Sequence, residues 1–170
     1  MKYFLSLGSN LGDRKKNISR ALAFLNDEGV KTLHLSSLYK TQPVGYSDQP
    51  WFYNQVVEVG TRLNPYDLLG VIKRIELKLK RQPAVPDGPR TLDIDILLAE
   101  KSIIQTKKLI IPHPRLDKRN FILTPLKELS PDTFHPVLRQ KIRDLLKKSG
   151  DPSLVIKLKK RKKRAPAGPA

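Results

Sequence analysis

The sequence predicts an α+β protein: a ferredoxin-like βαββαβ sheet with helices packed on it, additional C-terminal helices and a disordered basic tail. Two observations carry this prediction. Apolar residues recur at helical spacing in two segments, 14–27 and 64–81. Short segments rich in β-branched and aromatic residues lie before, between and after them. The resulting order of strands and helices is that of the ferredoxin-like fold.

The first half of the chain alternates clearly between elements. Residues 3–8 are predicted to form a strand, which the glycine-containing run at 8–12 ends. A helix over 14–27 follows. Residues 32–40 alternate between apolar and polar side chains and are predicted to form the second strand. Residues 41–50 hold two prolines and a glycine, so we expect a loop.

The second helix has a well-marked start. Residues 52–61 are predicted as the third strand, and Asn64 then offers an N-cap directly before Pro65, which suits the first helical position. Residues 82–90 contain three prolines and one glycine and are expected to form an irregular loop. Residues 91–98 are predicted as the fourth strand.

The C-terminal part is less regular. Residues 103–111 are predicted as a hairpin or edge strand, and 117–129 and 136–148 as helices. We expect one folded domain over 1–156 and a disordered tail over 157–170, where the sequence becomes basic and then rich in proline and alanine.

Composition excludes several classes of protein. A chain of 170 residues is the size of one domain. The absence of cysteine excludes disulfides, thiol catalysis and thiolate metal sites. No apolar run approaches the roughly 20 residues of a membrane span, and the apolar N-terminal stretch is too short for a signal peptide. We therefore expect a cytoplasmic, monomeric protein without membrane contact.

The net charge of +17 indicates an anionic ligand. Seven of the 33 basic residues lie in 157–164, and the rest of the chain is still basic. Nucleotides, phosphorylated metabolites and nucleic acid are all compatible with this charge. One alternative is thus a basic nucleic-acid-binding protein with a ferredoxin-like fold, although no aromatic RNA-recognition signature is present. The tail is either a solvated extension or a weak contact for nucleic acid.

The paired carboxylates Asp93 and Asp95 are the strongest candidate for chemistry. Side chains alternate along a strand, so these two point to the same face with Cα atoms about 6.7 Å apart. Leu92, Ile94 and Ile96 then point to the opposite face, into a core. The carboxylates are either solvated on an exposed face or held together by a cation such as magnesium, which combines a few carboxylates with phosphate oxygens and water.

Cationic side chains surround this strand in the sequence. Arg90 directly precedes it, Arg81 ends the second helix, and His113 is followed closely by Arg115 and Arg119. Arginine binds phosphate oxygens through a planar fork and stays charged. Cations beside a metal-binding strand are what a polyphosphate requires, although each of these residues alone could also be an ordinary surface side chain.

Aromatic residues next to an asparagine suggest a pocket for a flat heterocycle. Trp51 and Phe52 follow the loop that begins at Thr41, and Asn54 comes two residues later. The two aromatic side chains alternate across the strand, so at least one faces outward or into a pocket. The glycines at the chain start match neither a Walker loop nor a dinucleotide fingerprint.

Six motifs in order make the chain resemble the 6-hydroxymethyl-7,8-dihydropterin pyrophosphokinase family over residues 3–135. They are Gly8-Ser9-Asn10-Leu11-Gly12, Tyr39-Lys40-Thr41-Gln42-Pro43-Val44-Gly45, Gln49-Pro50-Trp51-Phe52-Tyr53-Asn54, Arg74-Ile75-Glu76, Gly88-Pro89-Arg90-Thr91-Leu92-Asp93-Ile94-Asp95-Ile96-Leu97 with Pro112-His113, and Arg119-Asn120-Phe121-Ile122-Leu123-Thr124-Pro125-Leu126. The resemblance implies transfer of pyrophosphate from ATP to the pterin hydroxymethyl group, with release of AMP, in folate biosynthesis.

The resemblance also implies a role for each matching residue. Two magnesium ions would be bound by Asp93 and Asp95. ATP would contact Glu76, Arg81, Arg90, His113 and Arg119, and the catalytic group would comprise Arg81, Arg90, Asp95 and His113. The pterin pocket would comprise Thr41, Val44, Phe52, Asn54 and Phe121, with the ring stacked between the two phenylalanines. The loop at 82–90 would close over ATP.

The loop before the aspartate strand departs from the family pattern. The family usually carries glycine where this chain has Lys80, a second arginine where it has Pro83, and often a tryptophan where it has Asp87. Arg81 matches the family's first arginine. We therefore expect loop closure and adenine packing to differ in this chain.

Overall fold

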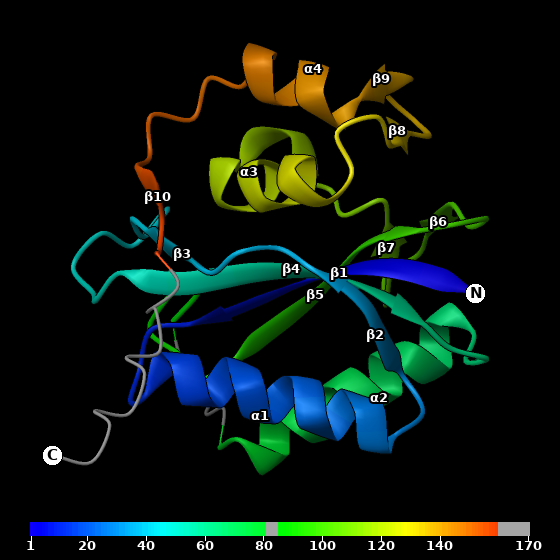
Figure 1. Cartoon of the computed structure of the whole chain (residues 1–170), viewed down its shortest axis with the longest axis horizontal. Helices are drawn as coiled ribbons and strands as arrows, with labels where there is room; N and C mark the ends of the chain where they lie inside the picture. The colour runs from blue at the N-terminus through cyan, green and yellow to red at the C-terminus, as the bar shows by residue number, and fades with distance from the viewer. Residues whose placement is uncertain (81–84, 160–170) are drawn as a thin grey trace, which may run out of the picture.

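A six-stranded antiparallel sheet forms the centre of the protein (Figure 1). The computed structural model describes residues 1–80 and 85–159 of the chain. The central strand β1 (Lys2–Ser9) lies between β4 (Phe52–Gly60) and β5 (Asp93–Ala99). Beyond β4 come β3 (Tyr39–Thr41) and β10 (Val155–Lys157), while β2 (Lys31–Leu35) also pairs with β4.

Helices cover both faces of this sheet. Figure 1 shows α1 (Arg14–Asp27) and α2 (Pro65–Lys78) on one face, and α3 (Asn120–Leu129) and α4 (Ile142–Lys148) on the other. The order β1-α1-β2/β3-β4-α2-β5 confirms the predicted ferredoxin-like α+β fold, with the two C-terminal helices added as a third layer.

Two apolar cores hold the three layers together. The larger core joins α1 and α2 to the sheet and includes Leu5, Leu7, Ile72 and Ile94, all buried. The smaller core lies under α3 and α4 and contains Leu97. Burial of these side chains is the main force that stabilises the fold.

The predicted helix starts are confirmed in detail. The side chain of Asn64 accepts hydrogen bonds from the backbone N–H groups of Tyr66 and Asp67, with Pro65 at the first position of α2. Asp13 caps α1 in the same way by accepting from the N–H of Lys16.

The strand predicted over 32–40 is divided into β2 and β3. Ser36 lies between them, and its backbone N–H donates to Val56 O while its hydroxyl accepts from Val56 N. This local arrangement replaces regular strand pairing. The expected element at 103–111 is a hairpin of β6 (Ile104–Gln105) and β7 (Ile110–Ile111).

The helix predicted over 136–148 is wrong in its first half. The hairpin β8 (Phe134–His135) and β9 (Gln140–Lys141) occupies that segment, and only α4 is helical. Arg139 has a φ of 55°, in the left-handed region that no α-helix uses.

In the predicted helix over 117–129, a 3₁₀ turn (Leu116–Lys118) precedes α3.

Strand β10 (Val155–Lys157) was also not predicted, and it spans the end of the expected domain and the start of the expected tail. Strand β10 pairs with β3, and Lys157 lies opposite Tyr39, so the expected boundary between residues 156 and 157 falls inside a strand. Residues 160–170 of the expected tail lie outside the described part of the chain. Within the described ranges, no helix is long and apolar enough to cross a membrane.

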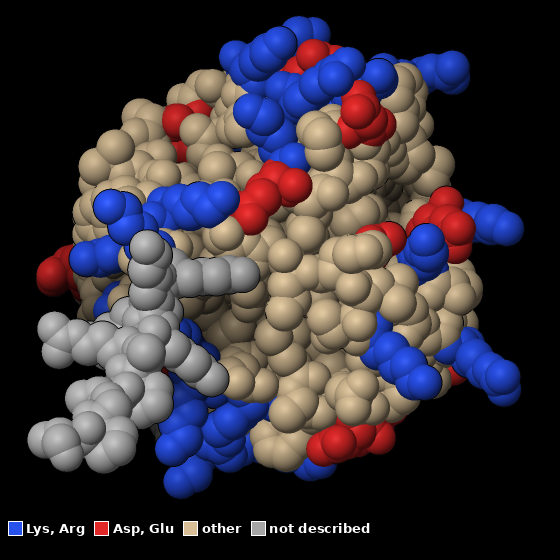
Figure 2. Space-filling model, in the orientation of Figure 1, with Lys and Arg blue, Asp and Glu red and all other residues tan. Residues whose placement is uncertain are grey.

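Basic side chains are spread over the visible surface. Figure 2 shows Lys and Arg gathered at the top of the molecule, where α4 lies, with acidic side chains among them. In the segment between α3 and β8, Asp132 forms ion pairs with Lys141 and Arg143.

The larger core yields a stability prediction on α2. The substitution Ile72→Ala removes a side chain with 0% exposure and should lower the free energy of unfolding by about 2–5 kcal/mol. Leu77→Ala on the same helix removes a side chain that is 71% exposed and should change it by less than about 0.5 kcal/mol. Urea denaturation of both variants tests this, and equal effects would contradict the assignment of the core face.

Candidate active site

The site is built across β4, β1 and β5 by their pairing register. Asn54 lies opposite Gly8, and Gly8 lies opposite Asp93. In the neighbouring row, Ser6 lies opposite Asp95. The side chains on β1 are small at these two positions, so the acidic and polar side chains on either side border open space above the sheet.

This space is a single cavity under the N-terminal end of α3. It encloses about 460 Å³, part of it open to solvent. The side chains that line it come from the sheet, from the loops after β3 and before β5, and from the start of α3: Ser6, Gly8, Thr41, Gln42, Val44, Phe52, Asn54, Asp87, Arg90, Asp93, Asp95, Arg119 and Phe121.

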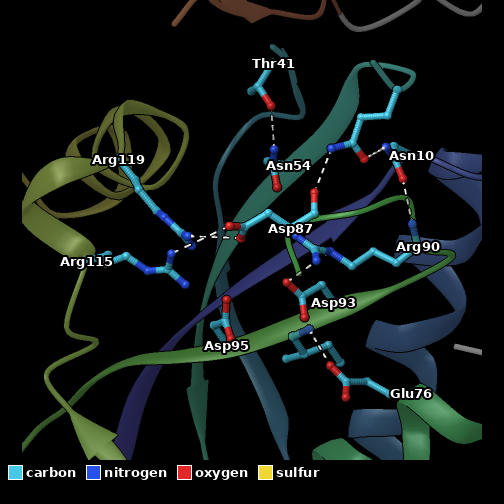
Figure 3. A network of polar contacts seen from close by, with 12 residues as sticks. Asn10, Thr41, Asn54, Glu76, Asp87, Arg90, Asp93, Asp95, Arg115 and Arg119 are labelled. Atoms are coloured by element: carbon cyan, nitrogen blue, oxygen red, sulfur yellow. Dashed lines mark hydrogen bonds and ion pairs between the residues drawn. The ribbon is translucent and has the colours of Figure 1, made fainter. Parts of the chain in front are cut away.

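A buried amide forms one end of the cavity. Asn54 Nδ2 donates a 2.6 Å hydrogen bond to Thr41 Oγ1, which fixes the orientation of the amide. A Cβ atom at Gly8 would lie 2.6 Å from Asn54 Oδ1, so this close approach requires glycine. The amide of Asn54, held by Thr41, therefore presents preoriented hydrogen-bonding groups to the cavity (Figure 3).

Each aromatic wall of the cavity is accompanied by an arginine. The guanidinium carbon of Arg90 lies 5.3 Å from the ring centre of Phe52. That of Arg119 lies 5.4 Å from the ring centre of Phe121. These distances are within the range of cation–π contacts. Flat apolar surfaces and anion-binding cations thus belong to one site.

The two aspartates lie where strand alternation places them. Both line the cavity, while Leu92, Ile94 and Ile96 are buried among core residues, which confirms the predicted facing. Arg90 Nε lies 3.4 Å from Asp93 Oδ2. Burial in the cavity, followed by the charge of Asp93, raises the pKa of Asp95 to about 7, although 35% of its side chain remains accessible.

His113 approaches the same carboxylate from outside the cavity lining. Its Nε2 lies 3.9 Å from Asp95 Oδ2, and its Nδ1 accepts a hydrogen bond from Arg115 N at 3.1 Å. Burial, followed by the charges of Arg119 and Arg115, lowers the pKa of His113 to about 4. The imidazole is therefore neutral near pH 7 and carries its proton on Nε2, facing Asp95.

Polar contacts anchor the described part of the loop before β5. Arg90 N donates to Asn10 Oδ1 at 2.8 Å, and Asn10 Nδ2 donates to Gln49 Oε1 at 2.9 Å. Gln49 Nε2 in turn donates to Asp87 O at 2.7 Å. Residues 8–12 and the loop at 41–50 therefore support Asp87 and Arg90.

Asp87 directs its carboxylate at two cations of the site. Figure 3 shows this side chain facing Arg119 and Arg115, whose nitrogens lie 3.5 and 3.9 Å from its oxygens. An acidic side chain thus lies against arginines that could otherwise bind an anion.

Most of the expected site residues meet at this cavity. Thr41, Val44, Phe52, Asn54, Phe121, Arg90, Asp93, Asp95 and Arg119 all line it. Glu76 does not: it is buried on α2 and accepts a hydrogen bond from Ile94 N at 3.0 Å, below the strand (Figure 3). Arg81, like Pro83, lies outside the described residues.

Sequence reasoning missed several residues that line the cavity. Ser6 and Gly8 alternate with buried leucines on β1, and this pattern of small residues on one strand face could have indicated them. Gln42 lies in one of the six motifs and Asp87 at a departure from the family pattern, but neither was predicted to line the site. Lys80, which replaces the family's glycine, has a φ of 57°, a conformation that favours glycine.

Comparison with known proteins decides the family. Residues 4–131 match the family described as 7,8-dihydro-6-hydroxymethylpterin-pyrophosphokinase (HPPK). The chain belongs to the HPPK family. This membership confirms the resemblance inferred from the six motifs, and it does not support the alternative of a nucleic-acid-binding protein.

Curated relatives agree with the HPPK match. The 2-amino-4-hydroxy-6-hydroxymethyldihydropteridine pyrophosphokinase of Bacillus subtilis is 46% identical over 127 residues, covering 74% of this chain and 76% of the relative. The Aquifex aeolicus protein of the same name is 39% identical over 141 residues, covering 83% and 88%. The folic acid synthesis protein fol1 of Schizosaccharomyces pombe is 42% identical over 146 residues, but this chain spans only 20% of its length.

Solved structures of HPPK-DHPS proteins share the fold. One, determined in complex with substrates, aligns with a TM-score of 0.68 at 17% identity, covering 86% of this chain and 42% of the other. The wild-type Plasmodium falciparum protein with pteroate aligns with a TM-score of 0.69 at 21% identity and the same coverage. At these identities the likeness concerns the fold alone.

The raised pKa of Asp95 predicts how stability depends on pH. In the folded protein its pKa is about 7, above the unfolded value near 3.8, so the folded state loses stability as pH rises between these values. In metal-free buffer, Asp95→Asn should therefore raise Tm at pH 8, by about 2–4 °C for each kcal/mol recovered. The gain should vanish towards pH 4.

Asp132→Asn is the matched control for this prediction. A hydrogen bond from Lys141 and the charge of Arg143 lower the pKa of Asp132, so its removal should not stabilise the protein at pH 8. Differential scanning calorimetry between pH 4 and 8 measures both variants. A Tm of Asp95→Asn at or below that of the parent at pH 8 would contradict the cost of burying the charged Asp95 beside Asp93.

Proposed function

We propose that this chain transfers the pyrophosphoryl group of ATP to the hydroxymethyl group of 6-hydroxymethyl-7,8-dihydropterin and releases AMP. The observation that carries the proposal is the single cavity in which an aromatic, amide-bearing pocket adjoins paired carboxylates and arginines. Family membership supports the same substrates. The pterin and ATP would meet above β1 and β5.

The pterin end is proposed to lie between Phe52 and Phe121. The amide of Asn54, held by Thr41, would pair with the polar edge of the ring, and Gly8 gives that amide its room. A site whose hydrogen-bonding groups are already oriented loses less entropy when the ligand binds. Val44 and Gln42 would complete this end.

The phosphate end is proposed to lie over the aspartates. Arg90 and Arg119 would contact phosphate oxygens and neutralise the charge that develops on the leaving AMP. His113, neutral and with its proton on Nε2, would donate a hydrogen bond to a phosphate oxygen rather than supply charge. Arg81 keeps its proposed role at the nucleotide by family resemblance, whereas the buried Glu76 would support Ile94 between the two aspartates rather than contact ATP.

The acidic pair fits magnesium. Two carboxylates face the same cavity, and burial followed by the charge of Asp93 raises the pKa of Asp95, which a bound cation would offset. The described residues contain no group of three or more His, Asp or Glu side chains placed to enclose a metal. Magnesium suits such a site because phosphate oxygens and water complete its coordination.

The reaction forms one bond and breaks one. The pterin hydroxyl oxygen bonds to the β-phosphorus of ATP, the bond from that phosphorus to the bridging oxygen of the α-phosphate breaks, and the hydroxyl proton is released. Two magnesium ions bound by Asp93 and Asp95 would supply charge neutralisation of the polyphosphate. The side chains of the cavity contribute orientation of both substrates and exclusion of water.

The first test is AMP release. We expect AMP from ATP only when both magnesium and 6-hydroxymethyl-7,8-dihydropterin are present. Asp95→Ala should lower this rate by about 100-fold or more, since loss of even an outer partner of a metal ligand costs about 10–100-fold. Asp132→Ala should keep the parent's rate. Normal turnover by a folded Asp95→Ala protein would refute the metal assignment.

A second test concerns Asp87. Because its carboxylate lies against Arg119 and Arg115, it competes with an anion for them. Asp87→Asn should tighten binding of inorganic pyrophosphate about fivefold, which corresponds to about 1 kcal/mol for a partly exposed ion pair. Titration calorimetry measures this. Asp48→Asn, which removes an exposed acid from a neighbouring loop, is the control; equal affinity in all three proteins would contradict the competition.

A further inference from the structure

A segment outside the family match runs along the active site. Residues 149–158, which we call the strap, follow α4 and end in β10, whereas the HPPK match covers residues 4–131. Figure 1 shows this part of the chain passing the end of α3 and reaching the sheet beside β3. Both elements that it reaches carry residues of the cavity.

At its first end, the strap caps α3 through Asp151. Asp151 Oδ2 accepts a hydrogen bond from Asn120 N at 2.8 Å, and its main-chain oxygen accepts one from Asn120 Nδ2 at 2.9 Å. The N-cap residue of α3, Arg119, makes no side-chain capping bond of its own. A carboxylate at a helix N-terminus satisfies a free N–H group and favours the helix dipole.

The capped residue lies between two residues of the site. Arg119 precedes Asn120 and Phe121 follows it, and both line the cavity. Burial would raise the pKa of Asp151, but hydrogen bonds from Ser153 and Asn120 and the charge of Arg119 more than offset this, so its pKa is lowered. The cap is therefore ionised throughout the neutral range.

At its other end, the strap is hydrogen-bonded to the opposite wall. Leu154 N donates to Gln42 Oε1 at 2.8 Å, and Gln42 N donates to Leu154 O at 3.0 Å. Val155 then lies opposite Thr41 in the β10–β3 pairing. Thr41 is the partner that orients Asn54, so this end of the strap supports the amide edge of the cavity.

Contacts at the two ends of α3 differ. Near its C-terminal end, Glu128 accepts hydrogen bonds from Ser37 and Tyr39 and so ties the helix to β3. Near its N-terminal end, where the cavity lies, Asp151 and Leu154 of the strap add polar contacts to the packing of the buried Ile122 and Leu123 on the sheet. Loss of Asp151 would remove the polar anchor beside Arg119 and Phe121.

We propose that Asp151 is a positioning residue for the transfer reaction, and that the strap sets the separation of the two walls of the substrate cavity. Asp151 acts through Asn120 on Arg119 and Phe121, while Leu154 and Val155 hold Gln42 and Thr41. This inference rests on the proposed function for its substrates. No residue of the strap lines the cavity.

Steady-state kinetics of the full chain test the proposal. Asp151→Ala should raise KM for 6-hydroxymethyl-7,8-dihydropterin about tenfold, with a smaller change in kcat, because misplaced walls bind the ring less well. Asp151→Asn keeps an acceptor for Asn120 N and should restore most of the affinity. Asp132→Ala removes a carboxylate of the same C-terminal region, and its KM should equal that of the parent.

If Asp151 only stabilises the fold, Tm and KM should change differently. In that case Asp151→Ala would lower Tm and the fraction of active protein, yet leave both KM values at the parent's level at temperatures where circular dichroism shows a folded chain. That result would overturn the proposal.

Hydrogen exchange separates this inference from the proposed function. In the ligand-free protein, Asp151→Ala should speed amide exchange at both walls, around 120–122 and around 41–42. Faster amide exchange at α3 alone would contradict the proposal that the strap connects the two walls of the cavity. Should the parent chain form no AMP, the proposed function fails, and exchange at the two walls still decides the role of the strap.

Discussion

The cross-strand register of β1 is the constraint on which the site depends. On one side of this strand, Leu5 and Leu7 are buried against α1 and α2. On the other, Ser6 and Gly8 lie between Asn54 on β4 and the aspartates on β5. A slip of one residue would exchange the two sets of side chains, filling the cavity and exposing the core. The core that stabilises the sheet therefore also fixes the floor of the site.

Unfavourable burial of negative charge is concentrated at Asp93 and Asp95, on the sheet side of the cavity. Two carboxylates face one cavity, and Asp95 takes up its proton far more readily than an exposed aspartate does. The pKa of His113 shifts in the opposite direction, because burial and then the charges of Arg119 and Arg115 lower it and keep the imidazole neutral. Opposed shifts of this kind cluster at functional sites, and they suit the proposed binding of phosphate and magnesium. The burial of Asp95 beside Asp93 lowers the free energy of unfolding when both carboxylates are charged.

The region outside the family match contributes to the same site. The strap joins the helical layer to the sheet at the point where both border the cavity. The loop before β5 departs from the family pattern at Asp87, which lies against two of the arginines. Residues at 81–84, where a family arginine is expected, lie outside the described chain. Asp87 and the strap thus bear on the cavity from outside the acidic pair.

The sequence by itself determined the elements and the local geometry. Periodicity and capping residues located α1, α2 and most strands of the central sheet, and alternation along β5 placed Asp93 and Asp95 on one face, because each depends on neighbours within a few residues. Only the tertiary structure decided the row from Asn54 through Gly8 to Asp93, the place of Glu76 behind the strand, the hairpin at 134–141 and the strap. These features arise from contacts between residues far apart in the chain, which local spacing does not record.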